Sequence, residues 1–218
     1  MSVTARLCTG ISVALALWFL MFSPVTSGLC SFWLEMSLAA VILTCISIWG
    51  TAPVRKAGKC ARYSFRACFK KAIVQTAEGV AIALALWGIF WIGDKLSGLI
   101  FDFARGQVDS VYMMKEGTSP ALIASLLLFL IGPAEEFFWR GYVQATLGRL
   151  TNPDLAFVIT TAIYALAHIW SGNFMLVMAA LVAGGVWGLI YRVKPALLPA
   201  LIISHAVWDA LVFVVFPI

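Results

Sequence analysis

Charged residues are scarce in this chain of 218 residues. Only 11% are Asp, Glu, Lys or Arg, whereas 62% are hydrophobic. Soluble globular domains carry about 25% charged residues. The shortage of charge, together with long uninterrupted apolar runs, excludes an ordinary soluble domain and predicts a polytopic protein embedded in a lipid bilayer.

The chain also lacks a basic face and a paired-cysteine motif. Its net charge of +5 comes mainly from one short basic segment and inter-helix turns, so no nucleic-acid partner is predicted. An odd number of cysteines cannot all pair within one chain. No C-x-x-C pair occurs, and we predict small apolar fillers or reduced thiols at Cys8, Cys30, Cys45, Cys60 and Cys68.

Seven apolar runs are long enough to cross a hydrocarbon core of ~30 Å, which takes ~20 helical residues. They lie at roughly 7–25, 29–50, 72–92, 119–147, 154–171, 174–191 and 197–216. We therefore predict an all-α fold: a single integral membrane domain, residues 1–218, with about seven transmembrane helices and an active site in the membrane interior. Residues 1–118 carry no motif and are predicted to be helical scaffold, whereas residues 119–216 carry the motifs.

Basic residues predict the orientation. The loop 51–71 holds seven Lys or Arg and no carboxylate, so it should be cytoplasmic. The N-terminus is then cytoplasmic, and most remaining basic residues outside the helices fall on the same side. Residues 93–120, on the outer side, are predicted to form either a short amphipathic helix on the leaflet or an ordinary solvated connection. The expected location is the inner membrane of a bacterium.

A few polar residues interrupt the last apolar runs. Charged groups at membrane depth are costly and by default suggest function. Counting 1.5 Å per residue from the cytoplasmic helix ends places these groups at depths of about 12–21 Å, so they can share one layer. They are Glu135, His168, His205 and Asp209. Gly132-Pro133 precedes the first of them and predicts a kink or a water-accessible opening.

Helical spacing separates the roles of these residues. Glu136 and Arg140 stand four apart and are predicted to form a structural ion pair. Glu135 has no basic partner at either helical spacing and is the free carboxylate. His205 and Asp209 also stand four apart, so one helix face presents an imidazole and a carboxylate together.

These groups together are the parts of a hydrolytic site. In one version Glu135, His168, His205 and Asp209 supply ligands for zinc, which lowers the pKa of a bound water. In the other version no metal is needed: Glu135 activates water directly, and His205 with a neighbour stabilises the oxyanion. The sequence leaves both versions open.

The order of motifs EExxxR, aromatic-xxx-His and Hxxx(N or D) over Ser119 to Phe216 resembles the CAAX-protease and bacteriocin-processing family. These are also called CPBP or Abi intramembrane proteases and include the Ras-converting-enzyme-type CAAX prenyl endopeptidases. The resemblance implies an intramembrane endopeptidase, often described as a metalloprotease. By position it makes Glu135 the catalytic glutamate and His168, His205 and Asp209 the remaining site residues.

Two positions depart from the common family pattern. Tyr164 stands where phenylalanine is common, which adds a hydroxyl. Asp209 stands where asparagine is common in the CAAX-processing branch, and an acid donates a hydrogen bond only when protonated. The substrate expected from the resemblance is a bacteriocin precursor, another small peptide or a membrane protein.

Two other classes of function remain open from the sequence. The same carboxylates and histidines could serve as a relay in an ion- or proton-coupled transporter, although no internal repeat of the kind found in many transporters occurs. The chain could also be a silent binding or self-immunity protein that keeps the fold without the chemistry. The oligomeric state is not predicted.

Overall fold

The structure, a computed structural model, describes the backbone of residues 1–55 and 65–218 and the side chains of residues 1–51 and 69–218. Within these ranges every regular element is helical. Most of the predicted basic cytoplasmic loop, with Arg55, Lys56, Lys59, Arg62 and Arg66, lies outside the residues whose side chains are described. Cys60 and Cys68 lie outside them as well.

Seven helical stretches in the described part of the chain are long and apolar enough to cross a membrane, which confirms the prediction. The chain is an integral membrane protein. The spans are α1 (Val3–Phe22), α2 (Phe32–Arg55), α3 (Phe65–Ile100), the composite helix Pro120–Leu150, α8 (Pro153–Ala167) with its 3-10 turn η3 (His168–Ser171), α9 (Phe174–Val193), and Pro195–Val215.

The third span is longer than predicted. Its 36 residues extend over about 54 Å at 1.5 Å per residue, well beyond a hydrocarbon core of ~30 Å. A helix can continue through charged residues such as Asp94 once it has left the membrane. The apolar run predicted at 72–92 therefore covers only the middle of α3. The short helix α4 (Ala104–Met113) then follows. Of the two alternatives predicted for residues 93–120, a short helix and an ordinary connection, the structure has the short helix.

The fourth span is not one regular helix. It consists of α5 (Pro120–Leu126), α6 (Gly132–Phe138) and α7 (Ala145–Leu150), joined by two π-helical segments, η1 (Leu127–Ile131) and η2 (Trp139–Gln144). Pro133 has no N–H for the carbonyl of Phe129, and the Gly132 N–H instead reaches the carbonyl of Leu127 five residues back. The structure has a π-helical segment that ends at Ile131, next to Gly132-Pro133, and the kink or water-accessible opening stays a prediction.

Glycine also lets this span approach its neighbour. A Cβ built on Gly132 would lie 2.8 Å from the Ala206 Cα on α10 (Leu198–Ala210), closer than real Cβ contacts allow. The last span continues from η4 (Pro195–Leu197) through α10 into the π-helical η5 (Leu211–Val215). As a result α10 packs between α3 and α6 and carries its polar residues into the interior.

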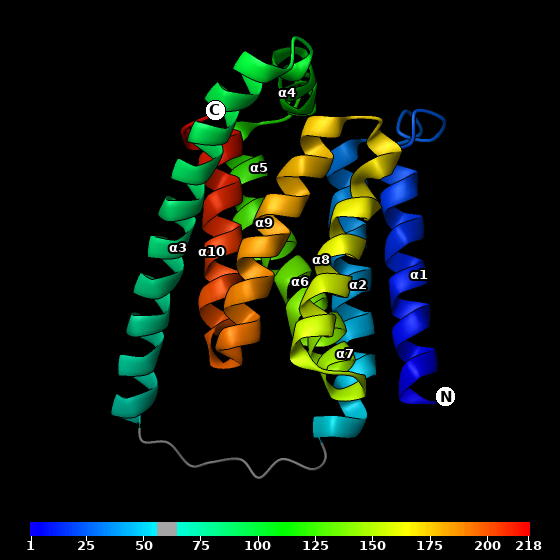
Figure 1. Cartoon of the computed structure of the whole chain (residues 1–218), viewed down its shortest axis with the longest axis vertical. Coiled ribbons are helices and arrows are strands. Elements are labelled where there is room, and N and C mark those ends of the chain that lie inside the picture. The colour runs from blue at the N-terminus through cyan, green and yellow to red at the C-terminus, as the bar shows by residue number, and fades with distance from the viewer. Residues whose placement is uncertain (56–64) are drawn as a thin grey trace.

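The helices form an antiparallel bundle that α4 crosses at one end, with the two ends of the described chain at opposite ends of the bundle (Figure 1). Opposite ends are what an odd number of spans requires. Helices α1 and α2 pack together beside α6, and α8 packs on α9. Three tryptophans, Trp18, Trp139 and Trp187, are fully buried between these helices.

Two glycines on α9 allow close packing of its neighbours. A Cβ added at Gly184 would lie 2.7 Å from the Tyr164 ring, and one added at Gly188 would meet Phe157 and Thr161. Gly185 differs, because a Cβ built on it has no side chain or neighbouring backbone within 4 Å among the described residues. Gly185 points away because successive helical residues turn by about 100°.

This contrast predicts that Gly184→Ala destabilises the protein and Gly185→Ala does not. The methyl group at Gly184 must displace the Tyr164 ring, and overpacking of this kind costs about 1–3 kcal/mol. Thermal unfolding of both variants in the same detergent measures the difference. Equal unfolding temperatures for the two variants would show that the contact between α8 and α9 is loose.

Candidate active site

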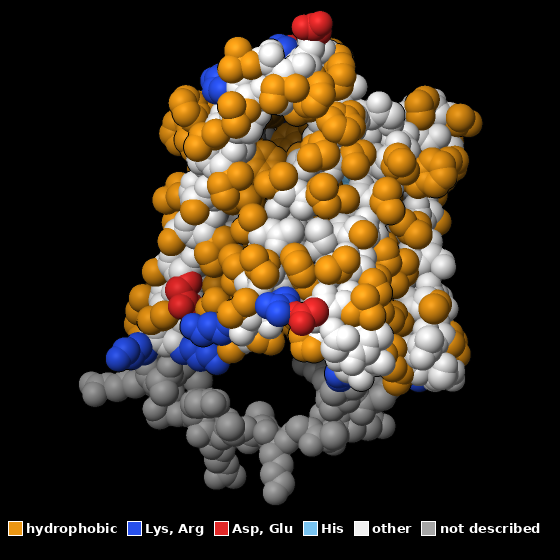
Figure 2. Space-filling model, in the orientation of Figure 1, with side chains coloured by type: hydrophobic (Ala, Val, Ile, Leu, Met, Phe, Trp, Pro, Cys, Tyr) orange, Lys and Arg blue, Asp and Glu red, His pale blue; other side chains and the backbone are white. Residues whose placement is uncertain are grey.

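A cavity of about 460 Å³ lies inside the bundle, in the half covered by α4. Figure 2 shows the surface hollowed just below α4, between α3 and α9. The cavity walls are mainly aromatic and methionine side chains, including Phe22, Trp33, Phe90, Met175, Trp208 and Phe213. The described residues that line it include no Lys or Arg.

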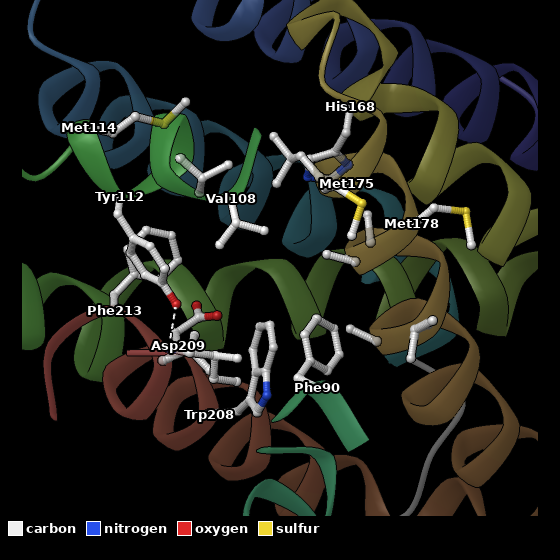
Figure 3. Close-up of a pocket in the computed structure, with 18 of the residues that line it drawn as sticks. Phe90, Val108, Tyr112, Met114, His168, Met175, Met178, Trp208, Asp209 and Phe213 are labelled. Atoms are coloured by element: carbon white, nitrogen blue, oxygen red, sulfur yellow. Dashed lines mark hydrogen bonds between the residues drawn. The ribbon is translucent and has the colours of Figure 1, made fainter. Parts of the chain in front are cut away.

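The structure brings all four predicted site residues to the wall of this cavity: Glu135, His168, His205 and Asp209. His168 and Asp209 face the same space from different helices, among aromatic and methionine side chains (Figure 3). Each of the four is at most 7% exposed. All four residues therefore border one cavity, and their common depth in the membrane stays a prediction.

Glu135 makes one hydrogen bond, and it comes from the neighbouring helix. The hydroxyl of Tyr164 on α8 donates to Glu135 Oε2 at 3.0 Å. The π-helical turn η1 and Pro133 place Glu135 in the first turn of α6, on the face that meets α8 and the cavity. One carboxylate oxygen is therefore held by Tyr164, and the other is left for water or substrate.

Glu136 forms the predicted ion pair, but it also has a second partner. Its Oε1 accepts from Arg140 Nη1 at 2.6 Å and from His205 Nδ1 at 3.0 Å. Arg140 also donates to the carbonyl of Gly184 at 2.9 Å, and it lies over the rings of Tyr164 and Trp187. The ion pair therefore connects α6 and η2 to α9 and α10, in addition to joining two residues of its own span.

His205 lies between two carboxylates. Its Nδ1 faces Glu136, and its Nε2 lies 3.5 Å from Asp209 Oδ2. The Trp187 ring stacks on the imidazole with 4.0 Å between centroids and 21° between planes, which fixes the ring plane. Asp209 makes no shorter polar contact with the described residues, so its carboxylate is open to the cavity.

His168 is held by one partner at each ring nitrogen. The α-helix of α8 ends at Ala167, which leaves the Tyr164 carbonyl without its usual N–H partner. His168 Nδ1 lies 2.9 Å from that carbonyl oxygen. On the other side, the indole Nε1 of Trp18 on α1 donates to His168 Nε2 at 3.1 Å.

The short helix α4 closes one end of the cavity. Val108, Val111 and Tyr112 contribute to the lining. The Tyr112 hydroxyl accepts from the amide of Ile218 at 3.0 Å, shown as the dashed line in Figure 3. Burial raises the pKa of Tyr112 above its ordinary value, so the hydroxyl stays neutral at the cavity rim.

The donor arrangement does not fit the zinc version of the site. Zinc needs three or four ligand atoms with free lone pairs. Both ring nitrogens of His168 already have hydrogen-bond partners, so His168 has no lone pair free for a metal ion. Among the described residues no group of three His, Cys, Asp or Glu is placed to hold a metal ion.

The sequence did not indicate the roles of two residues that hold the site residues in place, Tyr164 and Trp18. Tyr164 was noted only as a departure that adds a hydroxyl, yet that hydroxyl binds Glu135. Trp18 was not singled out at all. It lies 150 residues from His168 in a run with no motif, so no local spacing could have pointed to the contact.

Comparison with known proteins finds a family match for the motif-bearing part of the chain. Residues 117–211 match the family described as type II CAAX prenyl endopeptidase Rce1-like. This region is similar to that family. The match contains Glu135, His168, His205 and Asp209, and it confirms the resemblance to the CAAX protease family. No curated protein and no solved structure matches the chain.

At this site we predict that Tyr164→Phe lowers the kcat of peptide cleavage roughly tenfold while leaving the fold intact. The substitution keeps the ring that packs against Arg140 and removes only the hydrogen bond to Glu135, worth about 1.4 kcal/mol. Cleavage kinetics measure the effect. Tyr191→Phe, on α9 outside the cavity lining, is the matched control, and equal kcat values for the two variants would contradict the prediction.

Proposed function

We propose that the protein is an intramembrane endopeptidase that hydrolyses a peptide bond in a membrane-associated protein or peptide. One observation carries the proposal: a carboxylate without a basic partner, Glu135, faces an apolar cavity between spanning helices, together with His168, His205 and Asp209. All four residues lie in the segment that matches the Rce1-like family. This is a family of proteases, so the match supports the same conclusion.

In the proposed reaction Glu135 is the general base. Its free oxygen takes a proton from a water molecule in the cavity, and the water oxygen attacks the carbonyl carbon of the scissile bond. Tyr164 holds the second oxygen and so keeps the carboxylate turned toward the cavity. When the tetrahedral intermediate collapses, the proton on Glu135 passes to the leaving amine.

His205 is the proposed oxyanion donor. Glu136 accepts from Nδ1, which directs Nε2 toward Asp209 and the cavity. With a proton on Nε2, the ring donates to the negative charge that develops on the carbonyl oxygen. Asp209 orients this nitrogen. Asparagine, which is common at this position, could donate a hydrogen bond to the oxyanion itself, whereas an ionised aspartate can only accept one.

The cavity suits an apolar substrate segment. Its walls are aromatic and aliphatic, and its hollow lies between α3 and α9 near the outer end of the bundle (Figure 2). A bacteriocin precursor, a small peptide or a membrane protein fits this description. Peptide in extended form is required in any of these cases, because a helical backbone shields its carbonyl carbons.

The proposed orientation places the N-terminus in the cytoplasm of a bacterium. Described basic residues at the end of the bundle that holds the N-terminus are Arg6, Lys70, Lys71, Arg149, Arg192 and Lys194, against Lys95, Arg105 and Lys115 at the end that holds α4. This bias matches the positive-inside rule. The α4 end of the cavity then faces the outside of the cell.

The deciding experiment is a search for new peptide termini in water labelled with ¹⁸O. Membranes from cells expressing the wild type or Glu135→Gln are incubated in this water, and termini are identified by mass spectrometry. Hydrolysis adds one ¹⁸O to the new carboxylate in the wild type only. Identical termini in both samples would overturn the proposal, and proton-coupled uptake into vesicles lost in Glu135→Gln would favour a transporter.

Chelation is predicted to leave cleavage unchanged. Because both ring nitrogens of His168 already have hydrogen-bond partners, EDTA or phenanthroline should alter kcat/KM by less than about twofold. Metal analysis of purified wild type beside His168→Ala and His205→Ala gives the second measurement. Near one zinc per chain in the wild type, lost in both variants, would contradict this prediction and support the zinc version.

A further inference from the structure

The strongest unassigned feature near the site is the contact between α1 and the second-motif histidine. Trp18 is fully buried, and its ring meets the His168 ring edge-on at 5.9 Å between centroids. The indole N–H donates to Nε2 at 3.1 Å. Trp18 lies outside residues 117–211, so nothing in the family match assigns it a role.

The two partners of His168 determine its tautomer. A backbone carbonyl can only accept, so the contact with the Tyr164 oxygen requires the proton on Nδ1. An indole nitrogen can only donate, so the contact with Trp18 requires a lone pair on Nε2. The neutral ring with its proton on Nδ1 is the one form that satisfies both contacts.

We propose that Trp18 is a positioning residue that holds His168 as the neutral Nδ1–H tautomer, with its Nε2 lone pair directed to α1 and not to the cavity. The proposal deepens the proposed function and rests on it for the part that concerns cleavage. It makes α1 a functional neighbour of the site. His168 then takes no proton from water and binds no ligand through Nε2 while Trp18 stays in place.

The chain contains only two histidines, so ¹⁵N-histidine labelling gives a simple NMR spectrum. His205→Asn assigns the signals. In the wild type we expect His168 to show a protonated Nδ1 and an unprotonated Nε2. Labelling tryptophan as well should reveal a coupling across the hydrogen bond from Trp18 Nε1 to His168 Nε2, and this measurement needs no variant. A proton on Nε2, or no such coupling, would overturn the proposal.

Trp18→Phe removes the N–H and keeps an aromatic ring in place. We expect a shift of the His168 Nε2 signal and unchanged His205 signals. Trp139→Phe is the matched control, because Trp139 is also fully buried and packs on Trp18, yet its Nε1 has no hydrogen-bond partner in the described part of the chain. Equal His168 spectra in the two variants would overturn the proposal.

Cleavage of the peptide found by ¹⁸O labelling tests the positioning role separately. Trp18→Phe is expected to lower kcat about threefold or more with KM unchanged, since the ring loses one of its two anchors. Trp139→Phe should cleave as the wild type does. Wild-type kcat in Trp18→Phe would overturn the positioning role, whereas absence of cleavage in every form, with the tautomer as expected, would overturn the protease proposal alone.

Discussion

Glu135→Gln is expected to lower kcat/KM by about 10²–10⁴-fold, the usual contribution of a positioned general base. The amide keeps the size of the side chain and can still accept from Tyr164, but it cannot take a proton from water. Hydrolysis of the peptide identified by ¹⁸O labelling, followed by mass spectrometry over time, measures the effect. No other single change in the cavity should reduce cleavage as much.

The matched control is Glu116→Gln, which makes the same chemical change at an exposed position before α5. It should leave cleavage at the wild-type rate. Thermal unfolding should be nearly the same for both variants and the wild type, which separates chemistry from folding. A Glu135→Gln protein that cleaves at even a tenth of the wild-type rate would assign water activation to another group.

The second large effect concerns stability. Arg140→Met should lower the free energy of unfolding by about 3–5 kcal/mol, because it leaves the buried charge of Glu136 without its cation. Arg140 is 1% exposed and also donates to the Gly184 carbonyl, so η2 loses one of its hydrogen bonds to α9 as well. Thermal or denaturant unfolding in one detergent gives the measurement.

Arg149→Met is the control for Arg140→Met. Arg149 lies in the last turn of α7 and donates to the Thr146 hydroxyl at 3.0 Å, with no carboxylate partner among the described residues, so its loss should cost within about 0.5 kcal/mol. The double variant Glu136→Gln with Arg140→Met should recover part of the lost stability, since no unpaired charge remains. Wild-type stability in Arg140→Met would show that water reaches and solvates Glu136.

Part of the site follows directly from helical periodicity. The Glu136–Arg140 contact and the approach of His205 to Asp209 are both spacings of four on one helix, and both are present in the structure. Depth along the helices predicted one layer for Glu135 and His168, and both residues line one cavity in the structure. These predictions succeed because a helix has a fixed rise and turn, so neighbours within one helix are set by sequence spacing alone.

The second partner of each site residue could not be obtained in that way. The hydroxyl of Tyr164 on Glu135, the indole of Trp18 on His168 and Glu136 on His205 all join different helices. Such contacts depend on the rotation, tilt and separation of whole helices. Side-chain spacing in the sequence carries no information on these three quantities.

The sequence by itself determined an all-helical membrane protein with seven spans and an interior polar layer, because the thickness of the bilayer fixes how long an apolar run must be. Only the tertiary structure decided which oxygen of Glu135 is free, which nitrogen of His168 carries the proton, and that α1 reaches the site. The π-helical segments η1 and η2 flank α6, and they rotate the side chains of this span away from the directions that a continuous α-helix would give them. Close packing then selected one set of partners from the several that each polar group could have had.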